Sequence, residues 1–405
     1  MASILYSRVV GDLTVGKPKF IEFHQSRSVR EALETLIELN DFELPVWRVS
    51  RKKSLEKFGA NPERYETSAA KEERFVGMLS MVDIMRHLVS DSSLDDPIAA
   101  LEVSVSEIMT ADPTLVKLVA SGARLIDALT LINEGTRRLL VPLCPGSSRV
   151  SRRFCRSSFS SKWMIPQNYE LVLSKPDKPL GYCCLSVEDV ARFLLNCLGA
   201  LAPVPLTSIH SQGIINTSPP LIQCTDPAKN ALRIWPKAPA HIQAVAVVQE
   251  VDDGRKLLVG EISAIRLVRC GFRVAMALAA LSAADFAAYV EHFGDSTGVS
   301  EDENLWSKSL TDVNYQLQYK GRGKYSSIRS RIMPLTCRSS NSVAAVMAQM
   351  LAYRTTHVWV TEEDGTLQGI VTYPDIMAAL TSGSTPMDKL MATVIAKDIH
   401  SVIDL

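Results

Sequence analysis

Three stretches of the sequence place a hydroxyl side chain three residues before a carboxylate, at a point where a strand is expected to lead into a helix. These pairs are Ser80 and Asp83, Ser186 and Asp189, and Thr372 and Asp375. The N-terminus of a helix presents free backbone N–H groups that attract phosphate, and a hydroxyl there adds a donor. A carboxylate one turn into the helix can accept hydrogen bonds from both hydroxyls of a ribose. The pattern therefore predicts a nucleotide-binding site. A Ser or Thr cap followed by an acid is also an ordinary helix start, and this alternative stays open.

A fourth stretch, GEISAIR, departs from this pattern. It keeps Gly260 and Ser263 but has Arg266 at the position of the acid. A guanidinium cannot accept a hydrogen bond from a ribose hydroxyl, so we expect Arg266 to disable ribose binding at this position. Two alternatives stay open for Arg266, which could hold a phosphate or could be a solvated helix residue.

The residues around these stretches repeat in the order strand, helix, strand, strand, helix. In the clearest repeat, residues 334–381, apolar residues recur at helical spacing from Val343 to Leu351, which predicts a helix that ends near Tyr353. The β-rich runs HVWVT and LQGIVT, joined by EEDG, predict a hairpin. A second helix is expected to start near Tyr373.

Three upstream repeats follow the same order. In the first, Ser28 and Glu31 predict a capping box for a helix whose apolar face includes Ile37. In the third, Asp226 is the expected helix cap, with Pro227 at the first helical position. Trp47 and Trp359 occupy equivalent hairpin positions in the first and fourth repeats, where they would either pack in the core or stack on adenine.

The repeats predict an α+β fold of two paired modules, at residues 1–200 and 201–385, followed by a tail at residues 386–405. The repeats themselves span about 10–90, 105–200, 205–270 and 328–382, with polar insertions at 51–73 and 145–178 and a linker at 291–325. The second insertion is rich in Ser and Arg. It could be a kinase target, an anion-binding patch or a solvated loop.

On these features, and most specifically on GIVTYPDIMAAL with its preceding hairpin, the chain resembles plant CBS-domain proteins of the CBSX type. That family is related to the γ regulatory subunits of SNF1 and AMP-activated kinases. The resemblance implies that two CBS motifs pack sheet to sheet as a Bateman module, and that clefts in each module bind AMP, ADP or ATP.

The resemblance also assigns residues to the expected nucleotide site. The ribose-binding acids would be Asp83, Asp189 and Asp375, and the hydroxyls would be Ser80, Ser186, Ser263 and Thr372. The family places a basic residue, which meets phosphate, just ahead of the second strand, and here Arg138 and His357 hold that position. The first and third repeats have Glu43 and Ala244 there instead.

Composition narrows the function classes. Lys and Arg together number 44, as do Asp and Glu, so the chain lacks the charge excess expected of a nucleic-acid-binding protein. No apolar stretch is long enough to predict a membrane span, and the eight cysteines form no CxxC pair that would indicate a metal site. The N-terminal residues lack a secretory pattern and predict a cytoplasmic protein, with nuclear entry left open. No phosphate loop, dinucleotide-binding glycine pattern or hydrolase motif is present, which argues against an enzyme.

Together these observations predict a non-catalytic regulator without a cofactor, whose regulatory ligand is AMP, ADP or ATP. A ligand that binds one arrangement of a module more tightly would shift its population, and a client would respond to the shift. The expected client is an SNF1-related kinase catalytic subunit or another enzyme, and neither nucleic acid nor membrane is an expected partner. The alternative is an interaction scaffold whose clefts are unoccupied.

Overall fold

The computed structural model describes residues 3–51, 71–109, 112–143, 181–235, 241–269, 273–294 and 334–382. Their contacts define two compact units. The first contains the described residues of Met1–Ile21, Val116–Thr207 and Tyr373–Leu405, and the second those of Glu22–Leu115 and Ser208–Thr372. The modules predicted at 1–200 and 201–385 stay a prediction. The insertion at 145–178 and the tail lie outside the described residues, as do residues 295–325 of the linker and most of the insertion at 51–73.

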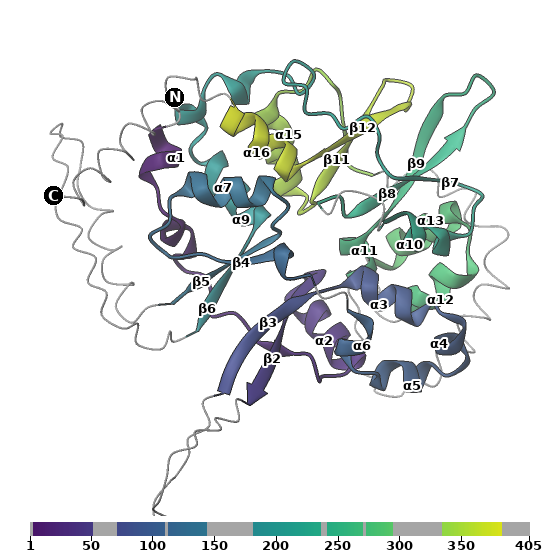
Figure 1. Ribbon diagram of the computed structural model, residues 1–405. Coiled ribbons are helices and arrows are strands. Elements are labelled where there is room, and N and C mark those ends of the chain that lie inside the picture. Colours follow the sequence, from purple (N-terminus) through teal and green to yellow (C-terminus); the bar gives the residue numbers. More distant parts are fainter. Residues whose placement is uncertain are drawn as a thin grey trace, which may run out of the picture. The chain divides into compact units, whose positions relative to one another are not determined.

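Four three-stranded sheets share one topology (Figure 1). In each sheet a short first strand runs parallel to the second, and the second and third strands form an antiparallel hairpin. The sheets comprise β1 (Phe23–His24), β2 (Glu43–Arg51) and β3 (Lys71–Ser80); β4 (Val116–Leu118), β5 (Arg138–Pro142) and β6 (Tyr182–Ser186); β7 (Leu221–Gln223), β8 (Ala244–Glu250) and β9 (Lys256–Ser263); and β10 (Thr336–Cys337), β11 (His357–Thr361) and β12 (Leu367–Thr372). The predicted α+β class and strand order are confirmed.

One helical segment follows the first strand of each repeat and a helix follows the third. These are α2 (Val29–Leu39) and α3 (Met81–Leu88); α7 (Leu125–Asn133) and α9 (Val187–Leu195); η5 (Ala228–Asn230) with α10 (Ala231–Ile234), and α11 (Ala264–Arg269); and α15 (Val343–Ala352) and α16 (Tyr373–Ser382). Further helices precede or connect the repeats: α1 (Ser3–Ser7), η1 (Val10–Thr14), α4 (Asp91–Asp95), α5 (Pro97–Glu102), α6 (Val105–Ile108), η2 (Pro113–Leu115), η3 (Leu198–Leu201), η4 (Val204–Leu206), α12 (Arg273–Ala280) and α13 (Ala283–Gly294). No helix among the described residues is both long and apolar enough to span a membrane.

The local helix signals are mostly confirmed. Ser28 and Glu31 form the predicted capping box of α2, and α15 ends at Tyr353. Ile37 is 44% exposed, so it lies outside the buried face of α2. Asp226 was wrongly predicted as a cap, because the 3₁₀ turn η5 begins at Ala228 and Pro227 therefore holds the cap position. The Asp226 carbonyl accepts a hydrogen bond from the N–H of Ala283.

That hydrogen bond is part of a regular exchange between repeats. The segment ahead of the fourth repeat bridges the start of the first helical segment in the third repeat, through Pro227 and Ser282. The segment ahead of the third repeat returns the contact through Ser208 and Ser342. The first two repeats show the same two bridges, Val9 with Arg124 and Ser28 with Ser104. In each of these two pairs of repeats, the segment that precedes one repeat therefore contacts the start of the first helical segment of the other.

Strand β8 shows how the apolar runs are used. Its residues alternate between two cores because side chains of a strand point to opposite faces. Val245 and Val247 belong to a core that also contains helices α2 and α3 of the first repeat and α11 and α13 of the third. Ala244, Ala246 and Val248 pack instead with Trp359 and Ile370 of the fourth repeat. The sheets of the third and fourth repeats therefore pack face to face.

In three of the four hairpins, a β-bulge lies immediately before a glycine that stands three residues ahead of the strand-end hydroxyl. We call this residue the motif glycine. The ladder skips one residue ahead of Gly77, Gly260 and Gly369, whereas the second repeat has Cys183 at this position and an unshifted ladder. A bulge adds one residue to a strand and so moves the following side chains to the opposite face. In these three repeats the strand-end residues therefore lie on the opposite face from the one that strict alternation along the third strand would give them.

Gly369 is also required by close packing. A Cβ atom here would lie 2.7 Å from Cγ2 of Ile215 and closer still to the carbonyl oxygen of Asn216. The backbone of Asn216 exchanges two hydrogen bonds with Ile370, which hold this segment against the strand. We therefore expect Gly369→Ala to lower the free energy of unfolding by about 1–3 kcal/mol through overpacking.

The matched control is Gly122→Ala, because a Cβ at Gly122 meets no heavy atom within 4 Å. This variant should change stability by less than about 0.5 kcal/mol in thermal unfolding. Equal melting temperatures for the two variants would show that close packing does not require glycine at position 369.

Candidate functional site

The four hydroxyls predicted for the nucleotide site occupy equivalent positions. Ser80, Ser186, Ser263 and Thr372 are the last residues of β3, β6, β9 and β12. In the ladders they face the first residue of the second strand, which is Glu43, Arg138, Ala244 and His357, respectively. The alignment of the four repeats is therefore confirmed by strand register, and each predicted basic residue lies directly across from a hydroxyl.

In the first repeat, Ser80 and Asp83 form a reciprocal cap on α3. The Asp83 N–H donates to Ser80 Oγ over 3.2 Å, and the Ser80 N–H and hydroxyl donate to Asp83 Oδ2 over 3.0 and 2.6 Å. Arg86 donates to Oδ1 of the same carboxylate over 3.0 Å. The Asp83 side chain keeps 14% exposure. The capping role considered from the sequence is thus present, on a carboxylate that still reaches the surface.

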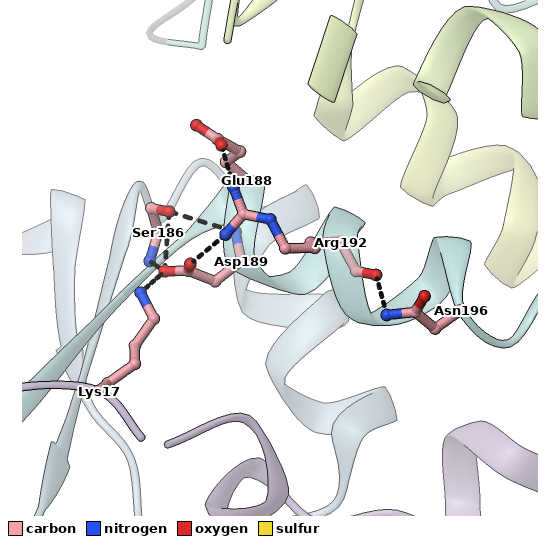
Figure 2. A network of polar contacts seen from close by, with 6 residues as sticks. All are labelled: Lys17, Ser186, Glu188, Asp189, Arg192 and Asn196. Carbon is pink, nitrogen blue, oxygen red and sulfur yellow. Dashed lines mark hydrogen bonds and ion pairs between the residues drawn. The ribbon is translucent and has the colours of Figure 1, made fainter. Parts of the chain in front are cut away.

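The second repeat repeats this cap on α9 and adds a lysine (Figure 2). Asp189 Oδ2 accepts from the N–H and the hydroxyl of Ser186 over 2.8 and 2.9 Å, and Arg192 donates to Oδ1 over 3.3 Å. The Lys17 ammonium, from the segment after η1, also binds Oδ2. Asp189 is 9% exposed, and burial alone would raise its pKa. The hydrogen bonds from Lys17 and Ser186 outweigh that effect and hold the pKa of Asp189 below its ordinary value.

In the fourth repeat, Thr372 and His357 are each 1% exposed on paired strands. Asp375 lies half-buried in the first turn of α16. The neighbouring hairpin residue Trp359 is fully buried, and its indole donates a 2.6 Å hydrogen bond to Glu261. Trp359 is therefore a core residue, as one of the two sequence interpretations held.

The third repeat has a carboxylate that sequence reasoning missed. Glu261, on β9, is 5% exposed and accepts hydrogen bonds from Ser263, His357 and Trp359. Arg266 Nε lies 2.8 Å from Glu261 Oε1, so the interpretation of Arg266 as a solvated helix residue is wrong. Burial opposes ionisation of Glu261, but Arg266 and His357 hold its pKa below its ordinary range.

Other reactive groups among the described residues have plain structural roles. Cys183, Cys184, Cys197, Cys224 and Cys337 are free thiols. Burial raises the pKa of the Cys337 thiol to about 12, which removes its thiolate at neutral pH. Within the described ranges, no three His, Cys, Asp or Glu side chains come together in a way that could hold a metal ion.

The repeated strand, helix and hairpin units, with a hydroxyl at each strand end, define the class of the chain. A CBS domain family model matches residues 328–382, the fourth repeat. CBS domain-containing protein CBSX6 of Arabidopsis thaliana is 37% identical, covering 94% of this chain and 95% of that protein. The chain belongs to the plant CBSX-type CBS-domain proteins.

One more distant relative and one solved structure are also similar to this chain. The SNF1-related protein kinase regulatory subunit gamma-like PV42b of the same plant is 24% identical over 93% of this chain and 96% of its own length. A solved structure of MJ1225 from Methanocaldococcus jannaschii, described as a candidate archaeal homologue of γ-AMPK, has a similar fold. It is 15% identical and covers 92% of this chain and 99% of that one, with a TM-score of 0.51.

The Lys17–Asp189 pair should contribute to the stability of its unit. Lys17→Met removes one charged donor from a nearly buried carboxylate, and we expect the free energy of unfolding to fall by about 1–3 kcal/mol at pH 7. Because the pKa of Asp189 is lowered by folding, the contribution of its carboxylate is present above pH 4 and is lost as the pH falls further. The gap between wild type and Lys17→Met should therefore narrow below about pH 4.

The comparison variant is Arg86→Met, which removes the 43% exposed partner of Asp83. This exposed pair should contribute less than about 1 kcal/mol. Chemical denaturation of both variants between pH 3 and 7 makes the measurement, and a Lys17→Met protein as stable as wild type would contradict the prediction.

Proposed function

We propose that this chain is a non-catalytic regulatory protein that senses AMP, ADP and ATP at the strand ends of its CBS repeats. The observation that carries the proposal is the repeated arrangement of a hydroxyl, a helix N-terminus and a first-turn acid. It occurs at Ser80 with Asp83, Ser186 with Asp189 and Thr372 with Asp375. The helices that start there have eight, nine and ten residues, long enough for their dipoles to favour phosphate at the N-terminus.

The charges of the second repeat suit a phosphorylated ligand. Arg138 lies across the ladder from Ser186, and Lys17 and Arg192 bind the carboxylate of Asp189. Arg192 also binds the carboxylate of Glu188, and these cations lie beside a strand-end hydroxyl and a helix N-terminus, a setting that favours an anionic group such as phosphate. The carboxylate of Asp189 itself can accept hydrogen bonds from ribose hydroxyls.

For the client, we propose an SNF1-related protein kinase catalytic subunit. Support comes from the 24% identical relative named as a gamma-like regulatory subunit of such a kinase. The CBSX relatives are named for their CBS domains and PV42b for a regulatory subunit, which fits regulation without chemistry in this chain. Co-purification of the tagged chain with a kinase catalytic subunit, with and without AMP, tests the partner.

Asp375 provides the sharpest test of nucleotide binding. If its carboxylate accepts two ribose hydroxyls, Asp375→Ala removes charge-assisted hydrogen bonds of about 1.5–3 kcal/mol each before compensation by water. The affinity for AMP, ADP or ATP should then fall at least about tenfold in calorimetry, and Asp375→Asn should show a similar loss.

Asp285→Ala is the matched control. Ser282 caps α13: its Oγ accepts from the Asp285 N–H over 3.2 Å, and its hydroxyl donates to Asp285 Oδ2 over 2.7 Å. No hairpin leads into this helix. Loss of the Asp285 side chain should lower thermal stability by about 0.5–1 kcal/mol and leave nucleotide affinity unchanged. If Asp375→Ala behaves in the same way, Asp375 is only a cap. If the wild-type chain binds no adenosine ligand, the scaffold alternative replaces the sensor.

A further inference from the structure

The hydrogen bonds of Glu261 form a complete shell around a buried carboxylate. Trp359 Nε1 and His357 Nε2 bind Oε2 over 2.6 and 3.0 Å. Arg266 Nε and Ser263 Oγ bind Oε1 over 2.8 and 3.0 Å. The donors come from β9, α11 and β11, so the carboxylate joins two facing sheets and a helix.

The arrangement of these donors resembles a binding site for an oxyanion. Four donors converge on two oxygens, and both the carboxylate and its partners on β9 and β11 are nearly excluded from water. Burying a charged group costs free energy unless the group is paired and hydrogen-bonded. Here both oxygens of the Glu261 carboxylate accept hydrogen bonds. The donors therefore match an anion in number, charge and geometry.

Three of the donors also lie at the positions where the other repeats have the residues expected to contact a nucleotide. Ser263 is the strand-end hydroxyl, His357 is the first residue of the second strand of the fourth repeat, and Arg266 stands where the other repeats have an acid. Instead of facing an open cleft, these three groups converge on a side chain of the same protein.

We propose that the polar pocket of the third repeat is an oxyanion site whose permanent occupant is the carboxylate of Glu261. The sheets of the third and fourth repeats are then held together by an internal anion and need no nucleotide. This extends the proposed function, because it confines nucleotide sensing to the other strand ends. The anion site itself does not depend on that function.

Chemical rescue tests the proposal. Glu261→Ala removes the group –CH2–COO⁻, whose free counterpart is acetate, and leaves the four donors in place. We expect the melting temperature of this variant to fall by about 5–10 °C in sodium chloride, because the buried donors of His357, Trp359 and Ser263 lose their shared acceptor. Sodium acetate or formate at the same ionic strength should restore at least half of the loss, with a saturable dependence on concentration, and should leave wild type unchanged.

Ile262→Ala is the matched control. Ile262 is 1% exposed, neighbours Glu261 on the same strand and faces the helical core, so its truncation leaves a cavity without donors. Its lowered melting temperature should not respond to acetate. A Glu261→Ala protein that melts as wild type does, or that responds to acetate no more than Ile262→Ala, would overturn the proposal.

Glu261→Gln provides a second test if the alanine variant does not fold. The amide keeps the shape of the side chain but not its charge, so this variant should melt below wild type at pH 7. The charged or titratable groups that face Glu261 are Arg266 on α11 and His357 on β11. Because folding lowers the pKa of Glu261, the gap should begin to narrow as the pH falls below about 4, where the carboxyl of the unfolded wild type becomes protonated, and should shrink further with more acid. A gap of zero at pH 7 would refute the internal anion. No nucleotide enters these assays, so their outcome is separate from that of the calorimetry.

Discussion

A three-stranded sheet has two faces and too little area to bury either of them alone, and this constraint shapes the second compact unit. Strand β8 alternates between a helical core on one side and the facing sheet of the fourth repeat on the other. Both faces are apolar, so the strand reads as an almost continuous hydrophobic run. Any polar group on the inner face must then be satisfied by the partner sheet, which is the situation of Glu261.

The sequence was sufficient for features that depend on neighbours along the chain. The helix period, the turn residues and the repetition of the unit predicted four hairpins. The hydroxyls and the residues aligned with them at the start of the second strands are ladder partners in the structure. The capping box of Ser28 and Glu31 is equally local. Such features require only that each short segment prefers the conformation it adopts in the fold.

Features that depend on contacts distant in sequence escaped prediction. The bulges that precede Gly77, Gly260 and Gly369 change which face the next residues occupy, and strict alternation would have put Glu261 on the wrong face of β9. Lys17 reaches Asp189 from 172 residues away. Asp226 is not a cap because the 3₁₀ turn begins one residue later than predicted, next to the segment whose Ala283 N–H binds the Asp226 carbonyl. An acid in a strand next to a motif glycine was the only available signal for Glu261.

The repeats differ in where they put their carboxylate, and that position decides what it can do. In the first, second and fourth repeats it lies in the first turn of the second helix, whereas α11 of the third repeat has no acid there. Asp83 and Asp189, each at a helix N-terminus, are 14% and 9% exposed, and these are the acids proposed to bind ribose. Glu261 comes from the strand, two residues before the hydroxyl, and enters the interface between the sheets. A carboxylate at the helix start can serve as helix cap and ligand acceptor at once, because each oxygen has two lone pairs. Both oxygens of the Glu261 carboxylate, inside the sheet interface, already accept hydrogen bonds from donors of the third and fourth repeats. These hydrogen bonds therefore stabilise the contact between the two repeats and leave no acceptor for a ligand.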